Sequence, residues 1–88
     1  MVVIHTRFLR KGDTVTVNDA ILGLEYTIKD IELDDDELLE FLFSLGCYSG
    51  ESITAVSRRK GTCVVSIKDA RYSIDNRLAD TIKLMPLR

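Results

Sequence analysis

The chain of 88 residues has one proline and two cysteines, and each scarcity excludes a class of protein. A single proline excludes collagen-like and proline-rich repeats. Two cysteines are too few for a disulfide-stabilised secreted domain, and Cys47 and Cys63 lie too far apart in sequence for a zinc knuckle or a thiol redox motif. We therefore expect a reducing location, the cytoplasm.

Long apolar runs are also missing. No run approaches the roughly 20 residues that span a bilayer, and the N-terminal region lacks the charged start, apolar middle and cleavage site of a signal peptide. We expect no membrane insertion. A chain of 88 residues has room for one core only, so residues 1–88 are expected to form a single domain.

Side chains with catalytic or ligand-binding chemistry are few and scattered. His5 is the only histidine, and together with Cys47 and Cys63 it falls short of a closed tetrahedral metal site. A cysteine nucleophile would need a base beside it, and no Gly-rich loop ending in Gly-Lys-Ser or Gly-Lys-Thr is present to hold phosphates. We expect no catalytic residue, cofactor or metal site, and both cysteines as small core residues. For Cys47 the alternative is a surface thiol that links two copies.

Charge is nearly balanced over the whole chain, with 12 basic and 14 acidic residues and a net charge of −2, but it is unevenly distributed. Residues 34–51 contain six acidic residues and no basic one, whereas residues 52–88 contain eight basic and three acidic residues. A folded molecule should therefore present opposite fields on different faces. Such a distribution can orient the protein on a charged partner, or head to tail on a second copy.

Short segments of alternating apolar residues predict about five strands, a number typical of a small curled barrel. The clearest segments are residues 14–17, 25–33, 52–57, 63–67 and 71–74, with shorter candidates at 2–4 and 83–85. Val15 and Val17 are expected on one face of the first. Residues 58–62 are expected to form a hairpin loop with a solvated basic tip.

One of these strands needs a bulge. Tyr26 and Ile28 have one parity along the segment 25–33, whereas Ile31 and Leu33 have the other. An extra residue near Lys29–Asp30 would let all four side chains point inward, as happens in curved sheets.

A helix is predicted at about residues 34–45. Asp34 is a suitable N-cap with Glu37 three residues later as in a capping box, and Gly46 can end the helix. The expected core stripe is Leu38, Leu42 and Leu45, with Leu39 and Phe43 extending it on one side and Phe41 on the other. A second, short helical turn near residues 75–81 would be capped by Asp75.

The order of motifs in the second half of the chain resembles a known family. Residues 45–53 read Leu-Gly-Cys-Tyr-Ser-Gly-Glu-Ser-Ile and follow the leucine-rich helix. After the hairpin glycine, Gly61, come an apolar strand at 64–67, a strand ending at Ile74, and Leu-Ala-Asp-Thr-Ile-Lys-Leu at 78–84. This order resembles the FeoA family, small cytosolic accessory proteins of bacterial ferrous iron uptake, over about residues 11–85.

Three features depart from the family pattern. Ser49 stands where proline is common, and Asp69-Ala70 stands where the turn often holds glycine. The helix begins with Asp34-Asp35-Asp36-Glu37, whereas in the family it is often basic at its start. The surface of this helix therefore has unusual charge for a relative of FeoA.

The resemblance implies a mainly β fold, a small SH3-like barrel of about five strands with one inserted helix. It also implies a non-enzymatic role: binding the cytosolic domain of a FeoB-like membrane ferrous iron transporter, whose own G domain handles GTP. The apolar arc of the helix is wider than the roughly 100° that a core-facing helix needs, so one aromatic edge should remain in water. Since aromatic side chains often dominate interfaces, Phe41, Leu45 and Tyr48 are the candidate partner-binding residues. Burial of both rings on the barrel is the alternative.

Two other functions stay open. A metal-responsive regulatory module, or a nucleic-acid-binding module with a basic patch, is the alternative of a different class. The patch would comprise Arg58, Arg59, Lys60, Lys68 and Arg71. Few aromatic residues lie beside it to stack on bases, so no nucleic-acid partner is expected. Homo-oligomerisation through exposed strand edges is the third hypothesis.

Overall fold

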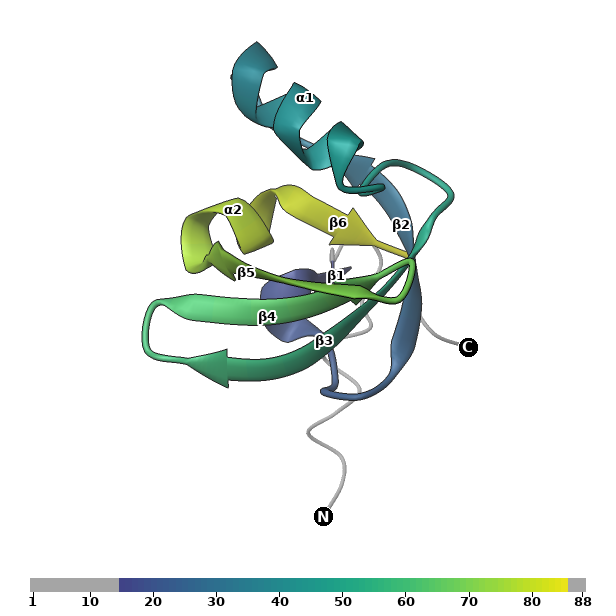
Figure 1. Cartoon of the computed structure of the whole chain (residues 1–88), viewed down its shortest axis with the longest axis vertical. Coiled ribbons are helices and arrows are strands. Elements are labelled where there is room, and N and C mark those ends of the chain that lie inside the picture. The colour runs from purple at the N-terminus through teal and green to yellow at the C-terminus, as the bar shows by residue number, and fades with distance from the viewer. Residues whose placement is uncertain (1–14, 86–88) are drawn as a thin grey trace.

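The computed structural model describes residues 15–85, which form one curled antiparallel sheet and two α-helices (Figure 1). The elements in chain order are β1 (Val15–Thr16), the 3₁₀ turn η2 (Val17–Asp19), β2 (Glu25–Ile31), α1 (Asp36–Ser44), β3 (Ser52–Arg59), β4 (Thr62–Ile67), β5 (Ala70–Asp75), α2 (Asn76–Thr81) and β6 (Ile82–Leu84). The strand order is β1-β6-β2-β3-β4-β5. The mainly β prediction is confirmed, with six strands instead of about five. The candidate strand at residues 2–4, His5 and Thr14 lie outside the described residues.

Strand β2 forms the corner of the barrel. Its first half pairs with β3 and its second half pairs with β6, and the register to β6 shifts between Ile28 and Asp30. This shift is the bulge predicted near Lys29–Asp30. Because of it, Ile28 and Ile31 both lie opposite buried residues of β6, Leu84 and Ile82.

The first predicted strand is shorter than expected. Strand β1 ends at Thr16, and Val17 begins a 3₁₀ turn, so Val15 and Val17 do not share the face of a strand. The reason is a capping box: Asn18 N donates to Thr16 Oγ1, while Thr16 N donates to the Asp19 carboxylate. These two hydrogen bonds stabilise the turn over a continued strand.

The core follows the alternation expected for β3 and β4. Ile53 and Ala55 on β3 are buried, and so are Cys63, Val65 and Ile67 on β4. The other buried apolar residues are Val17, Ala20, Tyr26, Ile28, Leu42, Cys47, Ile74, Ala79, Ile82 and Leu84. Asp75 caps α2 as predicted, with its carboxylate accepting from Leu78 N.

The β3–β4 connection corrects the prediction of a loop at residues 58–62. Both strands extend further, leaving only Lys60 and Gly61 between them. The register of the two strands shifts between Ala55 and Ser57, and this irregularity places Arg58 opposite Cys63, whose side chain is buried. Arg58 is therefore turned toward the interior and does not belong to a solvated basic tip.

Helix α1 stands away from the barrel and contacts it mainly at its C-terminal end (Figure 1). Leu42 is 1% exposed, and Leu45 packs partly buried against the core, but Leu38 is exposed, so the expected stripe is wrong at that position. The N-cap is Asp35 and not Asp34, because the Asp35 carboxylate accepts from the amides of Glu37 and Leu38. With this register the third helical residue is Leu38, so the capping box with Glu37 does not form.

The C-terminal end of α1 is fixed to β2. Gly46 N donates to Phe43 O and Cys47 N donates to Leu42 O, the two hydrogen bonds of a Schellman motif. Two hydrogen bonds hold the following turn to β2. Gly50 N donates to Ile28 O, and the Ser49 hydroxyl donates to Lys29 O. The prediction that Gly46 ends the helix is confirmed, with φ +92° at this residue.

Gly46 and Gly50 form a matched pair for testing this junction. Both have positive φ, but a Cβ at Gly46 would lie 2.9 Å from Lys68 Cε and 3.3 Å from Ile67 Cγ2, whereas a Cβ at Gly50 would meet nothing within 4 Å. We expect Gly46→Ala to lower the free energy of unfolding by about 2–3 kcal/mol, against about 1–2 kcal/mol for Gly50→Ala. Urea denaturation measures both; equal losses would show that the space around Gly46 is not a constraint.

Candidate functional site

An open groove of about 510 Å³ lies between α1 and β2. Helix α1 and strand β2 form its two walls, and the turn after α1 closes one end. The lining residues are Asp30, Ile31, Asp36, Leu39, Glu40, Phe43, Cys47, Tyr48 and Ser49. Hydrogen bonds between this turn and β2 anchor the C-terminal end of α1 beside the groove.

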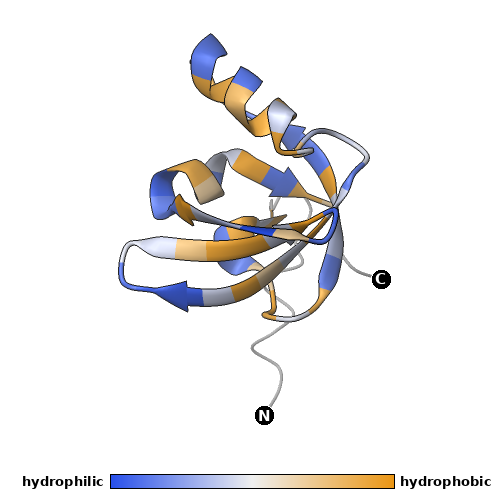
Figure 2. Ribbon diagram, viewed as in Figure 1, coloured by the Kyte–Doolittle hydropathy of each residue, from blue (hydrophilic) through white to orange (hydrophobic). Residues whose placement is uncertain are grey.

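The spacing of the α1 residues explains why they share this wall. Counted from Asp36, the other three lining residues of α1 lie three, four and seven positions later, at Leu39, Glu40 and Phe43. This spacing places all four on one side of a helix. Leu42 anchors the adjacent side in the core. Figure 2 shows that apolar residues continue along α1 even where the helix stands away from the barrel.

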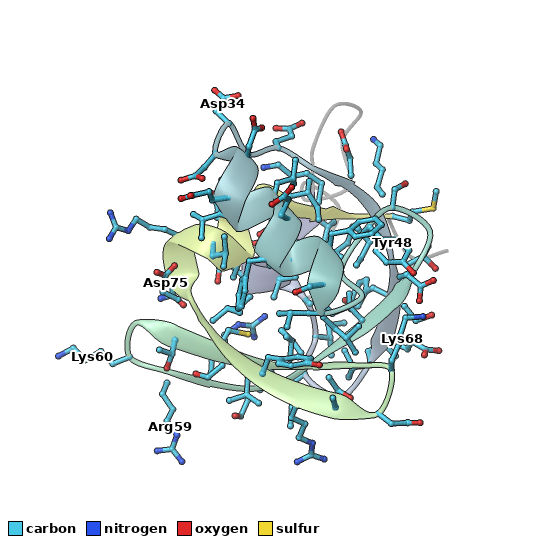
Figure 3. All side chains as sticks on the ribbon, turned by 45° about the horizontal axis from the view of Figure 1, so that its top comes forward. Asp34, Tyr48, Arg59, Lys60, Lys68 and Asp75 are labelled. Atoms are coloured by element: carbon cyan, nitrogen blue, oxygen red, sulfur yellow. The ribbon has the colours of Figure 1, made fainter. Side chains whose placement is uncertain are left out.

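Two aromatic rings meet at the closed end of the groove. The Phe43 and Tyr48 centroids are 4.7 Å apart, with the rings tilted by 32°. The Lys68 ammonium lies 6.0 Å from the centroid of the Tyr48 ring (Figure 3). It also forms an ion pair with Glu51 at 2.8 Å. The hydrogen bond that the Lys68 ammonium donates to the Glu51 carboxylate raises the pKa of Lys68, so Glu51 holds this cation at the end of the groove.

The rim of the groove is acidic. Asp30, Asp36 and Glu40 are exposed carboxylates among its lining residues. Within residues 15–85, the ion pairs formed by lysine and arginine are Lys68–Glu51 and Lys83–Glu32, neither of which involves a rim carboxylate. The groove therefore combines an apolar wall with a negative potential.

The structure separates the three predicted site residues. Tyr48 lines the groove, and Phe41 is 49% exposed as expected for a free aromatic edge. Phe41 does not line the groove, because it lies two positions from Phe43 and thus on a different side of α1. Leu45 packs partly buried against the core. Their role in binding a partner stays a prediction.

Two groove residues were missed in the sequence. Leu39 was expected only to extend the core stripe, and Phe43 likewise, but Phe43 is 63% exposed in the structure. The repeat of Asp36, Leu39, Glu40 and Phe43 on one side of a helix was the available signal. It indicates a shared side, but not that this side faces a groove.

Both cysteines are buried, as expected for small core residues. Burial raises the pKa of the Cys47 thiol from 9.0 to about 11, and burial likewise raises the pKa of Cys63 against an opposing effect of Arg58. A protonated, buried Cys47 does not fit the alternative of a surface thiol that links two copies. Among residues 15–85, no cluster of three or more His, Cys, Asp or Glu side chains is arranged to hold a metal ion.

The raised pKa of Cys47 makes stability fall at alkaline pH. Above pH 9.0 the unfolded chain loses the thiol proton while the folded chain keeps it to about pH 11, so unfolding becomes more favourable with rising pH. We expect the stability advantage of the wild type over Cys47→Ala to shrink by about 2–3 kcal/mol across this window. Urea denaturation of both proteins at several pH values measures it; a constant difference would mean that the thiol titrates normally.

Within the part of the chain that the structure describes, no helix is both long and apolar enough to cross a membrane.

The fold and the groove together define a small SH3-like barrel that carries a projecting, amphipathic helix. The FeoA domain model matches residues 15–86, which covers most of the chain. The chain therefore belongs to the FeoA family, a family of small accessory domains involved in ferrous iron transport. No curated protein sequence matches it.

Solved structures of FeoA proteins share this fold. A crystal structure described as the iron uptake regulatory protein FeoA matches with a TM-score of 0.69 and 21% identity, covering 81% of this chain and 93% of the other. The solution structure of iron(II) transport protein A from Clostridium thermocellum matches with a TM-score of 0.72 and 26% identity, covering 80% of this chain and 44% of the other.

The same fold occurs within larger regulators. A manganese-dependent transcriptional repressor matches with a TM-score of 0.76 and 20% identity, covering 88% of this chain. The match covers 43% of the repressor, so the chain corresponds to less than half of that protein. At this identity the likeness shows the fold alone.

Proposed function

We propose that this protein is a non-enzymatic, cytoplasmic accessory protein of ferrous iron uptake, which binds the cytosolic domain of a FeoB-like membrane transporter through α1 and the turn at residues 45–50. Membership of the FeoA family supports the connection with iron transport. The observation that carries the binding surface is the exposure of large apolar side chains on a helix that the barrel does not cover. These side chains are Leu38, Leu39, Phe41 and Phe43.

The cost of leaving this surface in water favours an interface. A helix on the outside of a barrel would normally bury its apolar face, and each large side chain buried contributes about 1.5–3 kcal/mol. Helix α1 buries apolar side chains against the barrel only at its C-terminal end, where hydrogen bonds hold the turn to β2. Contiguous exposed apolar side chains mark interaction sites, and aromatic residues often dominate the binding energy of such sites.

Titration calorimetry with the purified cytosolic domain of the transporter tests this proposal. We expect Phe41→Ala and Tyr48→Ala each to weaken binding by about tenfold or more, the loss typical of an aromatic interface residue. Ile21→Ala is the matched control, because Ile21 is 61% exposed and belongs to the η2–β2 connection, at the opposite end of the barrel from α1 (Figure 1). If both aromatic variants fold and bind as tightly as the control, the surface is wrong.

One residue of the basic patch expected for a nucleic-acid module, Arg58, is not available to bind nucleic acid. Arg58 Nη2 donates to the backbone carbonyls of Val17 and Ala20, so this side chain stabilises the fold. Arg59 and Lys60 remain in solvent at the hairpin tip (Figure 3). The likeness to metal-dependent repressors concerns the fold alone, and no observation on the described residues favours this alternative.

A further inference from the structure

We propose that the groove between α1 and β2 binds a basic amphipathic helix of the partner protein, with apolar side chains inserted beside Leu39 and Phe43 and lysine or arginine side chains facing the acidic rim. This inference rests on the proposed function for the identity of the partner and adds the chemistry of the segment that binds.

The shape of the groove favours side chains from a helix. One wall is itself a helix, whose lining positions 36, 39, 40 and 43 run along a single side. A second helix laid along this side presents residues at the same three- and four-residue spacing, as in helix-in-groove recognition. A volume of about 510 Å³ accommodates a few large side chains and not a folded domain.

The charge of the groove selects the sign of the partner. Asp30, Asp36 and Glu40 lie around the apolar wall, and residues 34–51 contain no basic residue. A basic helix would place its cations against these carboxylates, whereas an acidic helix with the same apolar residues would be repelled. The same charge disfavours contact with an anionic lipid surface.

Charge also excludes a second copy of α1 as the occupant, since two such helices would bring acidic residues against acidic residues. The basic hairpin tip of a second copy has the positive charge that the groove requires but lacks large apolar side chains. Its residues are Arg59, Lys60 and Gly61, and the exposed large apolar side chains of the described chain lie elsewhere, on residues 21–24, α1 and Met85. Such a tip would leave the apolar wall of the groove uncovered.

The test uses two synthetic peptides of roughly 18 residues, long enough to hold a helix in water. Both carry leucine and phenylalanine at helical spacing; one has lysines on its flanks and its twin has glutamates. Fluorescence anisotropy with the full chain measures both affinities at low and moderate salt. We expect the lysine peptide to bind at least about tenfold more tightly than the twin, with the difference shrinking as salt rises.

The double variant Asp36→Asn/Glu40→Gln removes two rim charges. We expect it to weaken the lysine peptide by about five- to tenfold and to improve the glutamate twin. Glu25→Gln/Asp69→Asn is the matched control, because it removes two exposed carboxylates that do not line the groove. Circular dichroism checks that α1 is retained in all variants.

Equal affinity for the two peptides, or equal binding of the lysine peptide by the two double variants, would overturn the inference. So would sedimentation with phosphatidylglycerol vesicles in the absence of peptide binding, or a dimer in light scattering that Phe43→Ala dissociates. These failures are distinct from failure of the proposed function. If the transporter domain binds through Phe41 and Tyr48 but the peptides do not discriminate, the partner is retained and the chemistry of its segment is wrong.

Discussion

Arg58→Ala is expected to lower the free energy of unfolding by about 2–4 kcal/mol, a large part of the roughly 4–13 kcal/mol available to a domain of this size. Arg58 Nη2 donates to Val17 O at 2.6 Å and to Ala20 O at 2.7 Å, which ties β3 to a segment about 40 positions earlier in the chain. Hydrogen bonds from a charged donor are among the strongest in proteins. The substitution would remove the Arg58 hydrogen bond to Ala20 O and would leave Val17 O with only the 3.3 Å hydrogen bond from Ala20 N.

Urea denaturation measures this loss. Arg59→Ala is the matched control, because its side chain points into solvent at the hairpin (Figure 3), and we expect a change below about 0.5 kcal/mol. Arg58→Lys should fall between the two, since a single ammonium does not reproduce the forked geometry of the guanidinium. If Arg58→Ala is as stable as Arg59→Ala, these hydrogen bonds do not contribute to the fold.

Phe43→Ala should weaken binding to the transporter domain by about 10- to 30-fold, the effect of removing a central aromatic residue from an interface. The ring is 63% exposed, so its removal should cost little stability, and the loss should reflect binding alone. Tyr48 loses its ring partner at 4.7 Å, which contributes to the expected effect.

The comparison with Phe41→Ala distinguishes two sides of α1. Both are exposed phenylalanines on one helix, but Phe43 lines the groove and Phe41 does not. Calorimetry should show the larger loss for Phe43→Ala. A larger loss for Phe41→Ala would move the interface to the other side of the helix and separate it from the groove.

Features that depend on local chemistry could be predicted from the sequence. The change of parity between Ile28 and Ile31 required the bulge that β2 contains. The Asp75 cap and the Gly46 terminus follow from backbone groups that must be paired at helix ends, so residue type and position are sufficient to locate them.

Features that depend on strand register or on tertiary contacts could not be predicted from the sequence. Three consecutive aspartates are equally good caps, and the structure places the cap at Asp35. The inward turn of Arg58 results from an irregular register between β3 and β4, which its flanking residues do not reveal.

The groove likewise could not be predicted from the sequence alone. Periodicity places Leu39 and Phe43 on one side of a helix, but their exposure depends on how far α1 extends beyond the barrel. That position is set by hydrogen bonds between the turn and β2, which join residues about 20 positions apart in the chain. Sequence patterns therefore identified the helix and its wide apolar arc, and the structure identified which side of it forms a site.

The central claim is that the partner binds in the groove between α1 and β2. Its most direct test is the change in amide chemical shifts of the ¹⁵N-labelled full chain when the transporter's cytosolic domain is added. We expect the largest changes at residues 30–31 and 36–49, the two walls and the closed end of the groove. Changes confined to the β5 edge at residues 70–75, or to the hairpin at residues 59–62, would contradict the claim.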